Sequence, residues 1–289
     1  MSQDMADLCL RRVRMNYWKP LLLTVGMYLI VQGLGIWISG GGLWVETGVV
    51  EKVSTGEIQP VVKNPEKAES SAQIFIYIIF MTIVLLILLK YKFDIIIKIF
   101  MFISLFFGLS FTFWNLIGEI GILIATILLA VGYWKRKNFV VMNIVLIFTI
   151  PGIGSWLGAS LSFIPSLILL IGLAIYDIIA VFGTKHMVKL AEGAKGKIPL
   201  MFAIPIEEKF LGLGTGDFAI SVVFSTSILR DYALHNSVFA VIGGLFGLIF
   251  ELIALFTYIT NKKDATLPAL PPIAAGMILG FAVSLFVQL

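Results

Sequence analysis

The stretch LSFIPSLILLIGLAIYDIIAVFG, residues 161–183, is long and apolar, and one aspartate, Asp177, interrupts it. A second apolar run, GTGDFAISVVFSTSIL at residues 214–229, carries Asp217 near its start. About 20 consecutive apolar residues suffice to cross the hydrocarbon core of a bilayer. An ionisable side chain at that depth is costly, so it normally faces the protein interior and carries function. The two aspartates are therefore the first candidates for a functional site.

The composition of the chain is that of a membrane protein. Of its 289 residues, 59% are hydrophobic and 13% are charged, and the mean hydropathy is +1.02. Soluble domains carry about 25% charged residues, so we interpret the chain as an integral, multi-pass membrane protein. The single cysteine, Cys9, can form no internal disulfide.

Apolar runs of suitable length predict an all-α fold with nine transmembrane helices. We expect them near residues 21–39, 74–90, 95–114, 118–134, 139–157, 162–183, 214–229, 237–259 and 268–287. The chain then divides into a basic tail (1–20), helices one to six (21–183) with an outer loop (40–73), a cytoplasmic loop (184–213) and helices seven to nine (214–289). The outer loop is glycine-rich and of mixed charge, and we expect it to be a mobile surface loop.

The basic residues predict the orientation of the helices. Four of the 21 lie in the junctions on one side, namely Lys52, Lys63, Lys67 and Arg230, and the other 17 lie in the N-terminal tail and the alternate junctions. Because Lys and Arg accumulate on the cytoplasmic side, we expect the N-terminus in the cytoplasm and the C-terminus outside. The net charge of +4 then follows from topology and calls for no nucleic acid.

The two aspartates are predicted to lie at the same depth. Asp177 precedes Lys185 by eight residues, and Asp217 follows Lys209 by eight. At 1.5 Å per helical residue, both carboxyl groups lie roughly 12 Å inside the cytoplasmic boundary. Helices six and seven run in opposite directions, so the two side chains can face each other.

A proline-rich segment, Leu267-Pro268-Ala269-Leu270-Pro271-Pro272, begins the ninth helix from the same side. Three prolines in five residues predict a partly unwound backbone, which in a membrane must line a cavity or be covered by protein. Gly214 and Gly216 let another backbone approach the seventh helix closely. Two acids and two accessible backbone segments therefore converge, as expected of a water-containing active site.

Two neighbouring carboxyl groups suit aspartyl proteolysis. They share a proton, so one acts as base on a water molecule while the other donates to the scissile carbonyl. A position at the start of a helix favours the ionised form of Asp217. We therefore expect Asp217 to be the base and Asp177 the acid, with exchange of the two roles as the alternative.

The motifs Tyr176-Asp177, Gly214-Thr215-Gly216-Asp217 and Pro268-Ala269-Leu270 resemble those of presenilin and signal peptide peptidase, the GxGD-type intramembrane aspartyl proteases. Each motif alone is weak, but all three stand in the right order and spans, and the nine-helix plan extends the resemblance over the whole chain. It implies an aspartic endopeptidase that cleaves within transmembrane segments, with Asp177 and Asp217 as the catalytic pair. The residues implied to shape the site or hold substrate are Tyr176, Gly214, Gly216, Pro268, Ala269 and Leu270. No metal and no cofactor are implied.

The predicted orientation is similar to that of presenilins, whereas signal peptide peptidases are inverted. It implies substrates whose N-terminus is outside. The junction at about 184–210 is much shorter than the large loop of animal presenilins and shows no obvious self-cleavage segment. We therefore expect a compact prokaryotic, archaeal homologue in the plasma membrane. Its partners would be transmembrane substrates and the lipid bilayer, without accessory subunits.

Three further features leave alternatives open. The apolar stretch 198–206, bounded by prolines, either lends a strand edge to the substrate or rests as a loop on the membrane surface. For Glu251, alone within the eighth predicted helix, a structural hydrogen bond is favoured over a catalytic role. His186 and His235 lie near opposite membrane faces and cannot form a metal site together.

A transporter is the competing class of protein, with Asp177, Asp217 and Glu251 relaying protons or sodium past broken helices. The sequence shows no clear inverted repeat, and the acids lie away from the membrane midplane. A noncatalytic scaffold would leave the buried acids without a role. The protease is the favoured interpretation.

Overall fold

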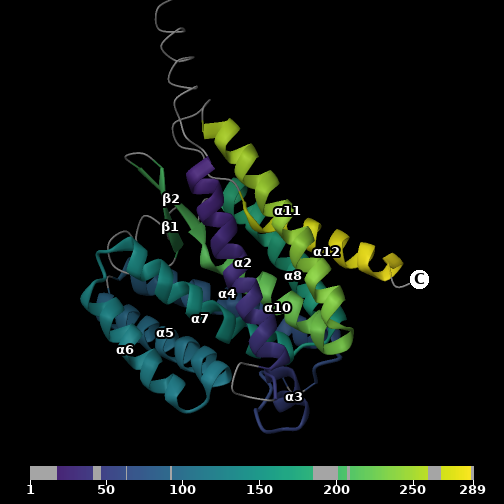
Figure 1. The fold of residues 1–289 in the computed structure, drawn as a ribbon. Helices are drawn as coiled ribbons and strands as arrows, with labels where there is room; N and C mark the ends of the chain where they lie inside the picture. Colours follow the sequence, from purple (N-terminus) through teal and green to yellow (C-terminus); the bar gives the residue numbers. More distant parts are fainter. Residues whose placement is uncertain are drawn as a thin grey trace, which may run out of the picture.

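The computed structural model describes residues 18–41, 47–62, 64–91, 93–184, 201–206, 209–259 and 268–287. These residues form a bundle of long helices with a two-stranded sheet at one end (Figure 1). The elements in chain order are α2 (Trp18–Gly40), α3 (Val49–Ser54), α4 (Ala68–Lys90), α5 (Asp94–Ile117), α6 (Ile120–Trp134), α7 (Phe139–Ala159), α8 (Phe163–Ile178), η1 (Ile179–Thr184), β1 (Met201–Ile206), β2 (Lys209–Gly214), α10 (Thr215–Asp231), α11 (Leu234–Ile259) and α12 (Leu270–Val287).

The predicted all-helical, multi-pass fold is confirmed. In the described part of the chain, seven helices are long and apolar enough to cross a membrane: α2, α4, α5, α7, α8 with its continuation, α11 and α12. Helices α6 and α10 are shorter, with 15 and 17 residues. Each apolar run chosen from the sequence overlaps a helix, but the number that spans the bilayer stays a prediction.

Helix α10 is unusually polar for a helix in the interior of the bundle. It packs against α2, α7, α8 and α11, and α2 and α8 supply partners for its hydroxyl groups. The Ser225 hydroxyl donates to Gln32 of α2 at 3.1 Å, and Thr226 pairs with Ser39 of α2 at 2.9 Å. Small hydroxyl residues let helices approach closely and bond to one another where no hydrophobic effect drives their association. Burial among other helices therefore explains why α10 can be less apolar than a lipid-facing span.

The two ends of the bundle differ. The sheet lies at the end where α2 begins, and α3 lies at the opposite end (Figure 1). Helix α3 falls within the segment 40–73, and the expectation of a mobile loop there is wrong for α3. Val49 is buried, and the buried Lys52 donates to the Asn115 side chain of α5 at 3.1 Å and lies 4.9 Å over the Trp114 ring. A buried cation with these partners anchors α3 to the bundle.

Candidate active site

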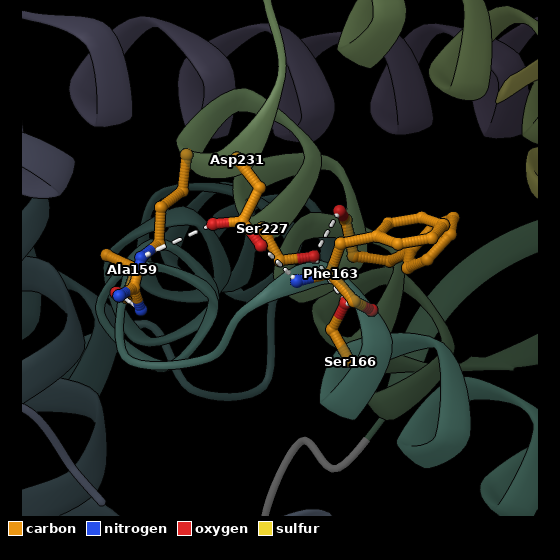
Figure 2. A network of polar contacts seen from close by, with 7 residues as sticks. Ala159, Phe163, Ser166, Ser227 and Asp231 are labelled. Atoms are coloured by element: carbon orange, nitrogen blue, oxygen red, sulfur yellow. Dashed lines mark hydrogen bonds and ion pairs between the residues drawn. The ribbon is translucent and has the colours of Figure 1, made fainter. Parts of the chain in front are cut away.

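Helices α8 and α10 are joined side by side near the end of the bundle that carries α3. The carboxylate of Asp231, at the end of α10, accepts a hydrogen bond of 2.6 Å from the backbone N–H of Phe163, at the start of α8. One turn further, the hydroxyl groups of Ser166 and Ser227 bond to each other (Figure 2). The first contact caps α8 at its N-terminus, where backbone N–H groups lack helical partners. Together the two contacts set the antiparallel register of the helices.

Arg230 extends this network to α7. Its Nη1 donates to the carbonyl of Ala159, the last residue of α7, at 2.9 Å, and its Nε lies 3.7 Å from Asp231 Oδ1. Three helices therefore meet in one polar cluster at this end (Figure 2).

The register brings the two aspartates together at the other end of the pair. Asp177 lies 11 residues after Ser166, and Asp217 lies 10 residues before Ser227. At 1.5 Å per residue, both positions are roughly 15 Å along the helices from the serine pair. The two carboxyl groups accordingly lie within electrostatic reach of each other.

The proline-rich segment contacts Asp177 directly. Its Oδ2 accepts a hydrogen bond of 3.3 Å from the backbone N–H of Leu270, the first residue of α12, and the Ala269 N–H points to the same carboxyl group. The segment is non-helical at Pro268 and Ala269, as expected. The expectation of unwinding at Pro271 and Pro272 is wrong, because they occupy the first turn of α12. Proline fits there because the N–H that it lacks would have no helical acceptor in the first turn. The free amides at the start of α12 are thus available to hold an acid.

Asp217 lies in the first turn of α10, directly after β2. A Cβ atom at Gly214 would lie 2.6 Å from Asp217 Oδ2, so this turn has room for glycine alone if the carboxyl group is to stay in place. Gly216 differs, since a Cβ atom there would meet nothing within 4 Å. The absence of a side chain at Gly214 thus leaves space for the Asp217 carboxyl group, whereas Gly216 borders open space.

Tyr176, the residue before Asp177, packs against a neighbouring helix. Its ring packs edge-on against Phe75 of α4, with 6.3 Å between the ring centroids. One turn after it, the backbone widens into the π-helix η1, a local form that often occurs at functional sites. The structure therefore places Tyr176 as a contact between α8 and α4.

Of the two alternatives left open for residues 198–206, the strand is present as β1, although 198–200 lie outside the described residues. It pairs antiparallel with β2, with Ala203 opposite Gly212. The side chain of Asn143, on α7, accepts from the Ala203 N–H at 3.0 Å and donates to the Ala203 carbonyl at 2.8 Å. Along an antiparallel pair, the backbone N–H and C=O groups of opposite residues alternately bond to the partner strand and point away from it. Because those of Ala203 bond to Asn143, the backbone groups of Gly212, which lies opposite, also point away from the partner strand. Asn143 thus covers the outer edge of β1, whereas β2 pairs with no further strand among the described residues.

Glu251 of α11 is a third acid near the pair. Its side chain is 4% exposed, and it interacts electrostatically with both Asp177 and Asp217. Oε2 has no hydrogen-bond partner among the described residues. The structural hydrogen bond favoured from the sequence is therefore absent for this atom within that part of the chain.

No three His, Cys, Asp or Glu side chains in the described ranges group closely enough to hold a metal ion. His235 lies at the start of α11, and His186 lies outside the described residues.

The sequence over residues 47–288 matches the family described as signal-peptide peptidase, presenilin aspartyl protease. This chain belongs to that family. Two solved structures of a presenilin family intramembrane aspartate protease, one in space group C222 and one in P2, match with a TM-score of 0.64 each, covering 93% of this chain and 99% of theirs. Their sequence identities to it are 24% and 25%. No curated protein matched. Membership of the presenilin family favours an intramembrane aspartic protease over the transporter.

Proposed function

We propose that Asp177 and Asp217 are the catalytic pair of this protease and that it is of the GxGD type. The observation that carries the proposal is the meeting of three separate segments: the end of α8, the start of α10 and the amides that open α12. Asp177 is held by the Leu270 N–H at 3.3 Å, and Asp217 is within electrostatic reach of it. Pro268, Ala269, Leu270 and the two glycines border the place where a peptide bond would lie.

The reaction needs a water molecule between the two acids. Asp217 lies in the first turn of α10 and Asp177 accepts from the amide that opens α12, so a helix N-terminus favours the ionised form of each, and either acid can serve as the base that takes a proton from the water. The hydroxide attacks the scissile carbonyl carbon while the protonated acid of the pair gives its proton to the carbonyl oxygen. The C–N bond then breaks as the base passes its proton to the leaving amine, and one hydroxyl group of the diol returns a proton to the other acid. The Leu270 amide fixes one oxygen of Asp177 and leaves the other free for this exchange.

The substrate helix must unwind before it is cut, and its freed backbone groups need partners inside the membrane. We assign that role to the outer edge of β2, which presents the backbone of Gly212 and leads without a break into α10 and Asp217. A strand added there would run towards the catalytic pair.

Replacing Gly212 by proline tests this edge, because it removes one outward N–H, and proline is tolerated on an edge strand. Gly212→Ala is the matched control, since it keeps the N–H and its Cβ meets the flexible side chain of Met201. We expect Gly212→Pro to cut cleavage at least tenfold with unchanged thermal stability. Full cleavage by Gly212→Pro would refute binding at this edge.

The orientation proposed is nine spans with the N-terminus in the cytoplasm and the C-terminus outside, so that substrates have their N-terminus outside. It is supported by the charge bias and by the placement of α3 opposite the start of α2 (Figure 1). Cys9, the single cysteine, offers a direct test. A membrane-impermeant maleimide should label it in inverted vesicles of a prokaryotic plasma membrane and leave it unlabelled in right-side-out vesicles. The opposite result would invert the topology and the substrate class.

We also propose that the chain acts without accessory subunits. The purified protein alone, in detergent, should cleave a single-span substrate. Cleavage that needs a membrane extract would contradict this point and leave the catalytic pair untouched.

A further inference from the structure

Glu251 is a buried acid that the reaction described above does not use. An ionisable group with an unbonded oxygen is costly inside a membrane protein, and such groups mark functional positions. Its neighbourhood follows from the packing of α11 against α12.

Glycines set the two helices in close contact over several turns. A Cβ atom at Gly243 would overlap the carbonyl of Gly276, and one at Gly247 would overlap the carbonyl of Pro272. The two helices are therefore antiparallel: moving four residues forward along α11 corresponds to moving four residues back along α12. Glu251 lies one turn further along α11, at the end of α12 where Pro268 and Ala269 precede the amides that hold Asp177.

The acids around this point come from three helices. Helix α8 supplies Asp177, α10 supplies Asp217, and α11 supplies Glu251, while α12 supplies backbone amides. Helix α2 supplies Tyr28, whose hydroxyl donates to the Val241 carbonyl at 3.4 Å about two and a half turns away along α11. No cation faces the three acids in the part of the chain that is described.

We propose that Glu251 is a third acid of the active centre, which acts on the reaction through Asp177 by setting the pH range in which the catalytic pair holds a single proton. The proposal rests on the proposed function of Asp177 and Asp217. Neighbouring carboxyl groups with few counter-charges titrate as one unit, so the state of the third affects the other two. Glu251 itself does not touch the substrate.

The test is the pH dependence of cleavage by the purified full-length chain. Glu251→Gln removes the acid and keeps the shape, so the pair should lose its last proton more readily, and the alkaline limb of the pH–rate profile should move to lower pH by on the order of one unit. Glu251→Asp should restore the parent profile in part. Leu252→Ala is the control: it removes the buried side chain next to Glu251 on the same helix, should lower the melting temperature, and should leave the pH–rate profile in place.

An unchanged profile in Glu251→Gln would overturn the proposal, and so would an equal shift in Leu252→Ala. If Glu251→Gln does not fold, Glu251→Asp takes its place: a smaller shift in the same direction supports the proposal, and an unchanged profile overturns it. Asp177→Asn and Asp217→Asn are measured in the same preparation. Cleavage that survives in them would refute the catalytic pair itself, whatever Glu251 does, so the two failures are distinct.

A second inference concerns the opposite side of the bundle, where α5, α6 and α7 enclose a cavity of about 310 Å³. The buried Leu129, Met142 and Val145 line it, together with the exposed Phe102, Lys98 and Arg136. Both cations are exposed, and neither forms an ion pair with a carboxylate among the described residues. The Arg136 guanidinium lies 5.6 Å from the centre of the Tyr133 ring, so its position is defined.

The geometry points to an anionic phospholipid as the occupant, with an acyl chain in the cavity and its phosphate on Lys98 and Arg136. Basic pockets between membrane helices bind such headgroups, and arginine suits phosphate oxygens. Basic residues also gather at helix ends for topology alone, so the control must remove the same charge outside the cavity.

Native mass spectrometry of the purified protein tests the site with phosphatidylglycerol and phosphatidylcholine. Retention of phosphatidylglycerol should fall at least tenfold in the double variant Lys98→Gln/Arg136→Gln and persist in Lys135→Gln/Lys137→Gln, which removes equal charge from the same turn outside the cavity. Equal loss in both variants, or equal retention of phosphatidylcholine by the parent, would overturn the proposal. Displacement by inorganic phosphate at the same concentration would also overturn it, because the acyl chain would then contribute nothing.

Discussion

The docking of the hairpin against α7 depends on Asn143, and this dependence can be measured. Asn143→Ala removes two hydrogen bonds to Ala203, of 3.0 and 2.8 Å. A hydrogen bond is worth about 1 kcal/mol net, so the two together give about 2 kcal/mol, or about a 30-fold change in the docking equilibrium. Asn143→Asp sets a carboxylate oxygen against the Ala203 carbonyl at a buried position, so we expect it to lose at least as much.

Hydrogen exchange at the Ala203 amide measures docking directly, and cleavage of a transmembrane substrate reports its consequence. Asn143→Ala should speed exchange about 30-fold and slow cleavage in parallel, because β2 would no longer be held beside Asp217. The control is Asn138→Ala on the same helix. It removes the N-cap bond of 3.0 Å to the Val140 N–H and costs about 1 kcal/mol without touching the hairpin.

If both variants change exchange at Ala203 equally, the effect comes from α7 as a whole, and the role given to Asn143 is wrong. If Asn143→Ala speeds exchange but leaves cleavage at the parent rate, the hairpin is not part of the active site.

Three other substitutions follow from the packing. Gly214→Ala should lower cleavage at least tenfold with little change in melting temperature, because its Cβ would displace the Asp217 carboxyl group; an active variant would show that the carboxyl position is not set by this turn. Gly243→Ala should lower the melting temperature, because its Cβ would overlap the facing carbonyl of α12. The control Gly33→Ala should hold or raise the melting temperature, because its Cβ meets nothing within 4 Å and alanine has the better helix propensity. A change of the same sign in both variants would contradict the close packing of α11 and α12. Asp231→Ala should cost about 1–2 kcal/mol of stability in a denaturant titration and Asp231→Asn less, since Asn still accepts from the first amide of α8; equal losses would show that the charge, and not the cap, matters.

Much of the site could be predicted from the sequence because its parts are local. The depth of Asp177 and Asp217 follows from the lengths of two apolar runs, and the arrival of Pro268–Leu270 follows from the start of a third. The turn at Gly214 and the helix that begins at Thr215 were also readable as a short motif.

The remainder depends on side chains that meet across long sequence separations. Asn143 is 60 residues from Ala203, and nothing in its own helix marks it as the partner of a strand. The polarity of α10 is explained by partners such as Gln32, 193 residues away from Ser225. Helix α3 is anchored by a lysine that composition alone assigns to a solvent-exposed loop. Such pairs are set by the packing of helices, which periodicity and hydropathy do not encode.

The most direct test of the account is cleavage of a single-span substrate with its N-terminus outside by the purified protein, beside Asp177→Asn and Asp217→Asn. We predict cleavage by the parent and none by either variant, with the melting temperatures of all three close together. Cleavage that survives in either folded variant would contradict the assignment of Asp177 and Asp217 as the catalytic pair.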